Sequence, residues 1–142
     1  MLKYLLAGAM LMAACLPAFA ADTATTIIAM ERAALNGGSF VAISAPDVSN
    51  LDPALDKPIK GLAALTAFYA TFPADDDPTP GEMSGVQVQV MNDIAVLSFH
   101  YVAHKGGKHE KFWNCSEVYR KTDADWRIVN THWSLTMPPK EN

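Results

Sequence analysis

The sequence predicts an α+β fold, with helices in the first half of the chain and an antiparallel sheet in the second half. Two observations lead to this prediction. Apolar residues recur at helical spacing before residue 73, and they alternate with polar residues at a period of two after residue 85. A polar run punctuated by prolines, at 73–80, separates the two halves. Helices followed by consecutive strands form the α+β arrangement.

The first helix is expected over residues 23–36. Its apolar residues Ile27, Met30 and Ala34 lie at helical spacing. Asn36-Gly37-Gly38 then supplies a stop, because glycine readily takes the left-handed conformation in which many helices end. The helix therefore has one apolar face that must pack against the rest of the domain.

A less regular segment leads into a second clear helix. Pro46 interrupts residues 40–53, for which we expect a short helix and a short strand. The second helix begins at Lys60-Gly61 and ends before Pro73, which cannot continue a helix. Its apolar stripe, which must cover a sheet, consists of Leu62, Leu65, Phe68, Tyr69 and Phe72.

Four strands are expected in the second half. They are separated by short turns that contain glycine, asparagine or aspartate. The expected strands are 86–90, 93–103, 111–121 and 126–136, with turns at Asn92-Asp93, Gly106-Gly107 and Asp123-Ala124. Consecutive strands joined by tight turns predict an antiparallel meander.

The first twenty residues have the pattern of a secretory signal peptide. Lys3 precedes an apolar stretch at 4–16, and Ala18-Phe19-Ala20 forms an A-x-A cleavage site. The apolar stretch is shorter than the ~20 residues that span a membrane, so we expect no transmembrane helix. Cleavage after Ala20 of the 142-residue chain leaves one domain, residues 21–142, in the periplasm or secreted.

A second processing route is open. Leu11-Met12-Ala13-Ala14-Cys15 resembles a bacterial lipobox, whose cysteine would be lipidated and become the first residue. We favour cleavage after Ala20, because Met12 is an uncommon residue in a lipobox. Both routes deliver the domain outside the cytoplasm, and they differ in the lipid tether at Cys15.

Composition excludes several classes of partner and cofactor. The formal charge is −4 and no basic stripe is present, so no nucleic acid is expected. Cys15 leaves with the signal peptide, and Cys115 alone cannot form an internal disulfide. His104 and His109 lack further ligands at metal spacing, and the carboxylates at 75–77 are too few for calcium. We expect no metal and no cofactor.

The segment from Trp113 to Ser134 resembles the closing hairpin of SnoaL-like domains and of the calcium/calmodulin-dependent kinase II association domain. Trp126-Arg127-Ile128-Val129, His132 and Ser134 match the pattern "W-[KR]-I-V-H-x-H-x-S". Asn130 stands where the pattern has its first histidine, and Ala124 replaces the turn glycine. A weaker likeness upstream comprises Asp47, Asp52-Pro53 and Pro58-Ile59-Lys60-Gly61.

This resemblance implies a cone-shaped, nuclear transport factor 2-like fold. In such a fold three N-terminal helices pack on the concave face of a curved antiparallel sheet and leave a pocket between helices and sheet. Members of the superfamily include isomerases, cyclases, dehydratases, ligand-binding proteins and oligomeric hubs, so the fold alone does not decide the chemistry.

Strand register predicts which side chains face the pocket. If Gly106-Gly107 is a two-residue loop, His100 lies opposite Trp113, and Glu117 shares their face. Periodicity alone does not decide which of the two faces of the sheet is concave. The resemblance implies that the face of His100, Trp113 and Glu117 is the concave one. We then expect Glu117 to be the polar group of the pocket, with its pKa raised by partial burial.

The last strand has two alternative registers. A three-residue loop at 122–124 places Trp133 beside Glu117, whereas a four-residue loop places His132 there. The missing glycine at Ala124 disfavours the shorter loop, and the resemblance favours it. We favour Trp133. Each tryptophan could instead be a core aromatic, and His132 a structural histidine.

These residues suggest three functions. The leading hypothesis is an exported binding or scaffold domain that holds a small, partly apolar molecule, with His100, Trp113, Glu117, Trp133 and His132 as the ligand-binding residues. The alternatives are an isomerase or dehydratase with Glu117 or His100 as general base, and a pure oligomerisation domain. We also expect a homodimer through the convex face, because the helices cannot cover both faces of the sheet.

Overall fold

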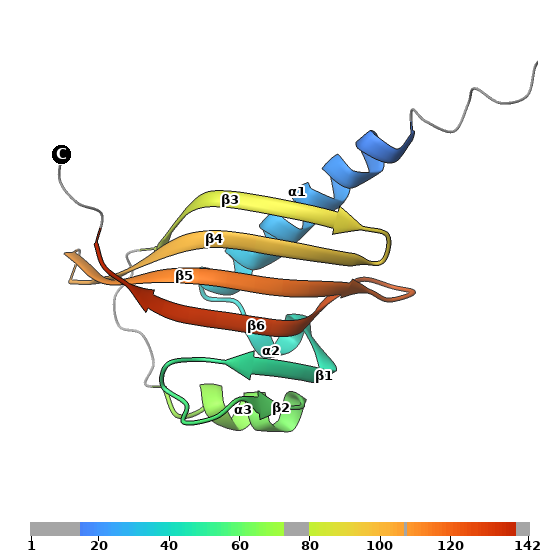
Figure 1. Cartoon of the computed structure of the whole chain (residues 1–142). Helices are drawn as coiled ribbons and strands as arrows, with labels where there is room; N and C mark the ends of the chain where they lie inside the picture. The colour runs from blue at the N-terminus through green and yellow to red at the C-terminus, as the bar shows by residue number, and fades with distance from the viewer. Residues whose placement is uncertain (1–14, 73–79, 107, 139–142) are drawn as a thin grey trace, which may run out of the picture.

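The computed structural model describes residues 15–72, 80–106 and 108–138, and their arrangement confirms the α+β prediction (Figure 1). Helices α1 (Cys15–Leu35) and α2 (Phe40–Ile43) come first. They are followed by β1 (Ser44–Leu51), β2 (Ile59–Lys60) and α3 (Leu62–Tyr69). The remaining strands are β3 (Glu82–Met91), β4 (Ile94–Lys105), β5 (Lys108–Lys121) and β6 (Trp126–Thr136).

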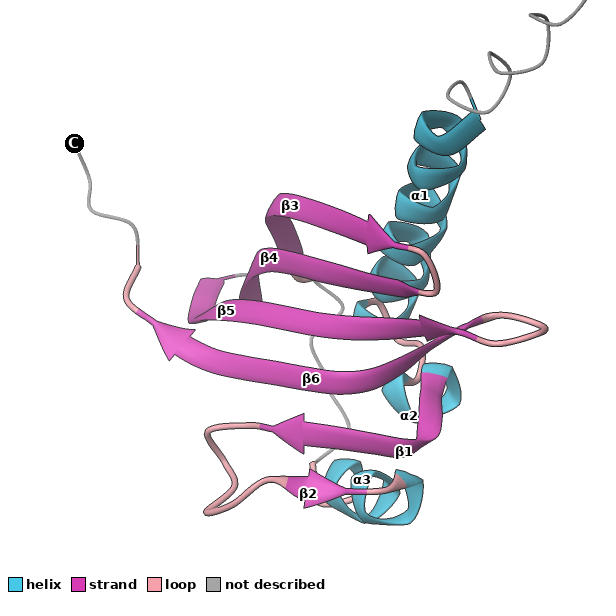
Figure 2. Ribbon diagram, turned by 45° about the vertical axis from the view of Figure 1, so that its right-hand side comes forward, coloured by secondary structure: helices cyan, strands magenta, loops and turns pink. Residues whose placement is uncertain are grey.

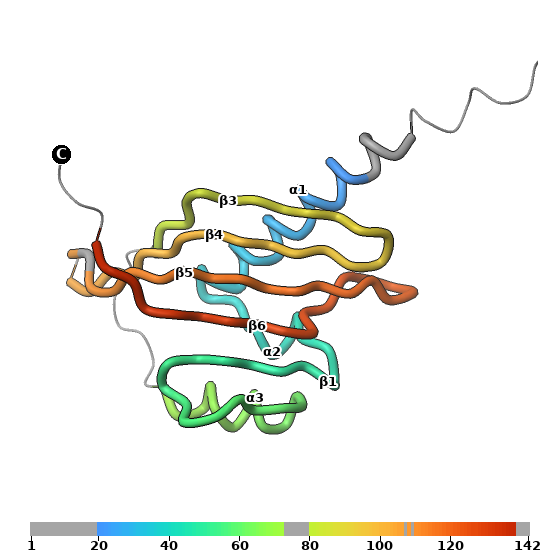
Figure 3. The backbone as a smooth tube through the Cα atoms, in the orientation of Figure 1, coloured from blue at the N-terminus to red at the C-terminus, as the bar shows by residue number. Residues whose placement is uncertain are grey.

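Helix α1 ends where the sequence predicts and begins earlier. Gly37 has a φ of +88°, and the N–H of Gly38 donates to the carbonyl of Ala33 across 3.0 Å, which closes the last turn. The first turns of α1 extend beyond the edge of the sheet (Figure 1). The part of α1 that is coloured in Figure 3 continues from there behind the sheet, and Thr23 is the first buried residue among those whose burial is described. No described helix is long and apolar enough to cross a membrane.

The described strands form one sheet of six, in the order β2-β1-β6-β5-β4-β3. Strands β3 to β6 are the predicted antiparallel meander. Strand β1 adds to it by pairing parallel with β6, and its register shifts between Ser44 and Ser49. Pro46 lies in that interval, where its missing N–H removes a ladder hydrogen bond.

A β-bulge in the hairpin of β4 and β5 overturns the predicted face of His100. Next to the turn, Lys105 pairs with Lys108, as a two-residue loop requires. Ala103 then pairs with Lys111, so β5 contains one extra residue and the register shifts by one. A one-residue shift moves side chains to the other face of a sheet. The prediction that His100 shares a face with Trp113 and Glu117 was therefore wrong.

In the hairpin of β5 and β6, a longer loop than expected and a shift of register compensate each other. The loop has four residues, since Lys121 pairs with Trp126. A register shift between Tyr119 and Val118 then restores the face that a shorter loop would have given, and Cys115 pairs with Trp133. The expected placement of Trp133 beside Glu117 is confirmed, although the three-residue loop was wrong.

The hydrophobic core lies between the sheet and the helices. Figures 1 and 2 show α1 and α2 on one face of the sheet, with α3 beside β1 and β2. Core residues on the sheet alternate along each strand, which defines the concave face. The core comprises Ile27, Val48, Leu65, Ala95, Leu97, Phe99, Cys115, Tyr119, Trp126 and Ile128.

Neighbouring positions on β4 provide a test of this face assignment. Leu97 is fully buried, whereas Val96 is half-buried on the opposite face. Leu97→Ala should lower the free energy of unfolding by about 2–5 kcal/mol, because it leaves a cavity in the core. Val96→Ala should cost only about 1 kcal/mol. Urea unfolding measures both, and a larger cost at Val96 would contradict this assignment of the two faces of β4.

Candidate functional site

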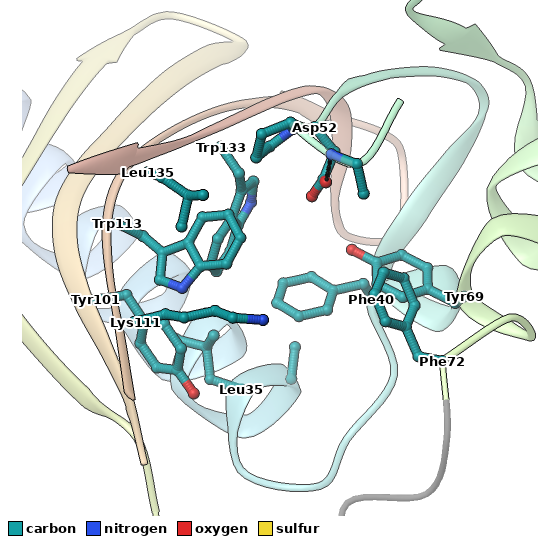
Figure 4. Close-up of a pocket in the computed structure, with 13 residues that line it drawn as sticks. Leu35, Phe40, Asp52, Tyr69, Phe72, Tyr101, Lys111, Trp113, Trp133 and Leu135 are labelled. Atoms are coloured by element: carbon teal, nitrogen blue, oxygen red, sulfur yellow. Dashed lines mark hydrogen bonds between the residues drawn. The ribbon is translucent and has the colours of Figure 1, made fainter. Parts of the chain in front are cut away.

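The concave face contains a pocket of about 550 Å³ (Figure 4). Strands β4, β5 and β6 form one wall, and the ends of α1 and α3, α2 and the segment after β1 form the other. The residues that line it are Ala34, Leu35, Phe40, Asp52, Pro53, Ala54, Tyr69, Phe72, Tyr101, Lys111, Trp113, Trp133 and Leu135. This volume lies in the range of small-molecule sites.

Aromatic rings form most of the pocket wall, and Trp133 lies at their centre. Phe40, Tyr101 and Trp113 each meet its ring edge-to-face, with centroid distances between 5.7 and 6.0 Å. Phe40 in turn stacks on Tyr69 at 5.7 Å. Edge-to-face and stacked contacts stabilise aromatic pairs beyond simple burial, so these rings hold one another in place.

Two charged side chains also line the pocket, and neither was among the predicted site residues. Asp52 follows β1, and its Oδ1 accepts a hydrogen bond from the N–H of Ala54 across 2.8 Å, which orients the carboxylate. Lys111 lies two positions before Trp113 on β5 and so shares its face. Alternation along β5 from Trp113 was therefore a signal that could have indicated Lys111 from the sequence.

Beneath the pocket lies a buried pair of carboxyl groups, Glu31 on α1 and Glu117 on β5. Tyr119 lies between them, since its hydroxyl donates to Oε2 of Glu31 across 2.6 Å and is 3.2 Å from Oε2 of Glu117. Trp133 donates from Nε1 to Oε1 of Glu117 across 3.2 Å. Glu31, Glu117 and Tyr119 have no exposed surface. The pair is therefore sealed from solvent.

Burial favours the neutral form of Glu117. Loss of solvation raises the pKa of Glu117 well above its ordinary value, and the adjacent carboxyl of Glu31 raises it further, against the lowering effect of the Trp133 hydrogen bond. Burial also raises the pKa of Glu31, opposed by its hydrogen bonds with Glu117 and Tyr119. A phenol has one proton to donate, which the shorter contact assigns to Glu31. Protonated Glu117 can then donate to the Tyr119 oxygen.

Glu31 was not predicted, although its position carried a signal. It lies four residues after Ile27 and three before Ala34, on the buried face of α1. A carboxylate on the apolar stripe of a helix needs a buried partner. The partner could not be named from the sequence, because it depends on how α1 lies on the sheet.

The structure brings three of the five predicted site residues together. Trp113 and Trp133 line the pocket, and Glu117 lies on the same face but beneath it, so it is not a lining residue. His100 is exposed on the opposite face, where its Nδ1 is 2.7 Å from Oδ1 of Asn114. His132 is exposed and lines a second pocket of about 450 Å³, which shares Asp52, Pro53, Trp133 and Leu135 with the first.

Cys115 and the possible metal ligands are not among the predicted ligand-binding residues. Cys115 is a buried free thiol, and burial raises its pKa, which favours the inert form. The carboxylates at 75–77 lie outside the described residues. Within the described ranges, no three histidine, cysteine, aspartate or glutamate side chains come together in a way that could hold a metal ion.

Comparison with known families agrees with this architecture. The sequence pattern of the SnoaL-like domain family matches residues 23–138. The chain belongs to the SnoaL-like domain family. The matched range begins at the first residue that the structure shows as buried. No curated protein matches this SnoaL-like chain.

Solved structures show the same cone-shaped, nuclear transport factor 2-like fold. One is a candidate ketosteroid isomerase from Parabacteroides distasonis, 37% identical, with a TM-score of 0.70 over 79% of this chain and 86% of that one. Another is the CamKII hub homology domain of Chlamydomonas reinhardtii, 22% identical, with a TM-score of 0.65 over 81% and 98%. A third is an NTF2-like protein from Pseudomonas putida, 21% identical, with a TM-score of 0.65 over 83% and 87%.

The buried carboxyl pair gives this SnoaL-like domain an expected dependence of stability on pH. A carboxyl whose pKa is raised by folding binds its proton more tightly in the folded protein than in the unfolded chain. Its contribution is complete below the ordinary pKa of 4.5 and is lost as the pH rises through the raised value. Glu117→Gln keeps an acceptor for Trp133 and a donor for Tyr119 but cannot ionise. Its gain in free energy of unfolding over wild type should therefore be larger at about pH 8 than at about pH 5.

Urea unfolding of wild type and variant across this pH range measures the effect. Glu110→Gln is the matched control, because Glu110 lies on the same strand and is exposed. The control should keep the wild-type pH slope. If Glu117→Gln also kept that slope, the Glu117 carboxyl would titrate as an ordinary solvated acid.

Proposed function

We propose that this protein is an exported SnoaL-like domain that binds a small, partly apolar molecule in its aromatic pocket. The observation that supports this most is the wall of mutually packed rings around a pocket of about 550 Å³. Small-molecule sites are typically concave and apolar, with a few placed polar groups. Because the rings already contact one another, the pocket is formed before a ligand arrives, which reduces the entropy cost of binding.

Neither predicted general base supports catalysis in this pocket. Glu117 has no exposed surface, and burial raises its pKa, which favours the protonated acid over the base, beneath the pocket floor. His100 is on the other face of the sheet. A general base must lie within hydrogen-bond reach of the proton that it removes. Binding is therefore favoured over an isomerase that uses either residue.

A second candidate is an isomerase in which Asp52 is the base. Asp52 provides the one carboxylate among the described lining residues, and Figure 4 shows it directed into the pocket near the hydroxyl of Tyr69. The similar protein from Parabacteroides distasonis is named a candidate ketosteroid isomerase. Such a reaction requires a base beside a carbon next to a carbonyl group. Isomerisation of a 3-oxo-Δ5-steroid that is lost in Asp52→Asn would favour this candidate.

Binding is tested with a neutral aromatic probe, p-cresol, followed by ¹H–¹⁵N NMR. The probe should shift the indole resonances of Trp113 and Trp133, because both rings line the pocket. Trp113→Ala should weaken binding roughly fivefold through lost apolar contact. Met91→Ala removes an exposed apolar side chain outside the pocket and should leave binding unchanged. Shifts confined to the convex face would rule out this site.

Export rests on the signal-peptide pattern of the first twenty residues. We expect a periplasmic species that begins at Ala21, because the A-x-A site precedes that residue. Burial supports this boundary, since Ala21 and Asp22 are exposed and Thr23 is buried. Intact-mass measurement of protein from the periplasm is the test. A lipidated species that begins at Cys15 would establish the alternative route, and an uncleaved chain would reject both.

The convex face supports a homodimer. Half-buried apolar side chains lie there on neighbouring strands, at Ile94, Val96, Val102, Phe112 and Val118. An uncovered apolar sheet face favours association with a second copy. Light scattering at micromolar concentration should give twice the chain mass, and Val96→Glu should lower it to one chain. A wild-type monomer would end this proposal and the oligomerisation hypothesis, while leaving the pocket untouched.

A further inference from the structure

The aromatic pocket contains two opposite charges that do not pair with each other. Asp52 and Lys111 both line it, and no ion pair joins them. In the described part of the chain, the hydrogen bonds of Asp52 engage Oδ1 alone, and none engages Nζ of Lys111. One carboxylate oxygen and one ammonium group are therefore available to a bound molecule.

The two charges approach the pocket from opposite walls. Figure 4 shows the Lys111 chain extending from the side of Tyr101 and Trp113 in the direction of Phe40, with its ammonium group within the pocket. Asp52 points in from the loop after β1. Lysine places its hydrocarbon stem along apolar surface and keeps its charged end accessible. Aromatic rings therefore lie between a cationic end and an anionic end.

We propose that the pocket binds a small aromatic carboxylate with a hydroxyl or amino group at its opposite end. This inference rests on the proposed binding function and names its ligand class. The ring would pack among Phe40, Trp113 and Trp133, the carboxylate would meet Lys111, and the donor group would meet Asp52. A cation without a carboxylate is opposed by Lys111, and a dianion is opposed by Asp52.

Exposure limits how strong this discrimination can be. Lys111 is exposed, and surface ion pairs contribute little because water and salt screen them. The contribution of Lys111 should amount to roughly a three- to fivefold change in affinity and should diminish at high salt. Asp52 is half-buried, so its hydrogen bond to a ligand hydroxyl should contribute roughly fivefold.

Four probes separate the two ends of the ligand. p-Cresol, 4-hydroxyphenylacetate and tyramine share a phenol ring and differ in charge, and phenylacetate lacks the hydroxyl group. We expect 4-hydroxyphenylacetate to bind more tightly than p-cresol and phenylacetate, and tyramine to bind most weakly. Affinities come from titration of the Trp113 and Trp133 indole resonances.

Two variants with matched controls assign the preference to residues. Lys111→Gln should remove the preference for 4-hydroxyphenylacetate over p-cresol while leaving p-cresol binding unchanged. Lys108→Gln makes the same charge change on the same strand away from the pocket and should preserve that preference. Asp52→Asn should reduce the advantage of 4-hydroxyphenylacetate over phenylacetate, and the exposed turn variant Asp123→Asn should not. Thermal unfolding of each variant verifies that the fold is intact.

The outcomes distinguish this inference from the binding function on which it rests. If p-cresol binds at the indoles but all four probes bind equally, the inference is wrong and the binding function stands. A preference that survives in Lys111→Gln also overturns it. If no probe shifts Trp113 or Trp133, both the binding function and the inference fail.

Discussion

Burial of Glu31 and Glu117 in the core is the constraint on which the rest of the structure depends. Each carboxyl would be costly in an apolar core without hydrogen-bond partners. Tyr119 contacts both, at 2.6 and 3.2 Å, and so connects α1 to β5. Because the partners come from a helix and a strand, the hydrogen bonds form only when α1 lies on the sheet at one depth and rotation. Apolar packing alone would specify that position less sharply.

The same network supports the pocket. Trp133 donates to Glu117 and presents its ring to the pocket above, where Phe40, Tyr101 and Trp113 pack around it. The hydrogen bond fixes the indole from below, and the neighbouring rings fix it from the sides. A pocket wall that cannot rearrange freely loses less entropy when it binds a ligand. Core electrostatics and pocket shape thus share one residue.

Charge is arranged by depth in this domain. Burial, and then the neighbouring carboxyl of Glu31, favour the neutral form of Glu117 in the deep carboxyl pair. The charged groups that a ligand can reach are Asp52 and Lys111. This separation explains why Glu117 is unsuitable as a general base: a ligand in the pocket cannot reach it. Fold membership leaves the function open, because superfamily members share the cone and differ in the side chains that line it.

Local patterns in the sequence determined the elements. Helical spacing and Gly37 fixed the end of α1, alternation fixed β3 to β6, and the motif around Trp126 and Ser134 led to the correct fold. Those signals are local, since they arise from residues a few positions apart. The position of Trp133 also followed, although two unpredicted changes of register cancelled to produce it.

Tertiary structure alone decided which residues meet. The bulge beside Lys111 turned His100 away from the pocket and brought its neighbour Tyr101 into it, and nothing in the composition of that hairpin marks the extra residue. The parallel pairing of β1 with β6 carries Asp52 to the pocket from about sixty to eighty residues away along the chain, and the docking of α1 brings Glu31 to Glu117. Strand register and helix docking depend on many distant contacts together. A single-residue shift reverses the face of every side chain beyond it, so the site required the folded chain.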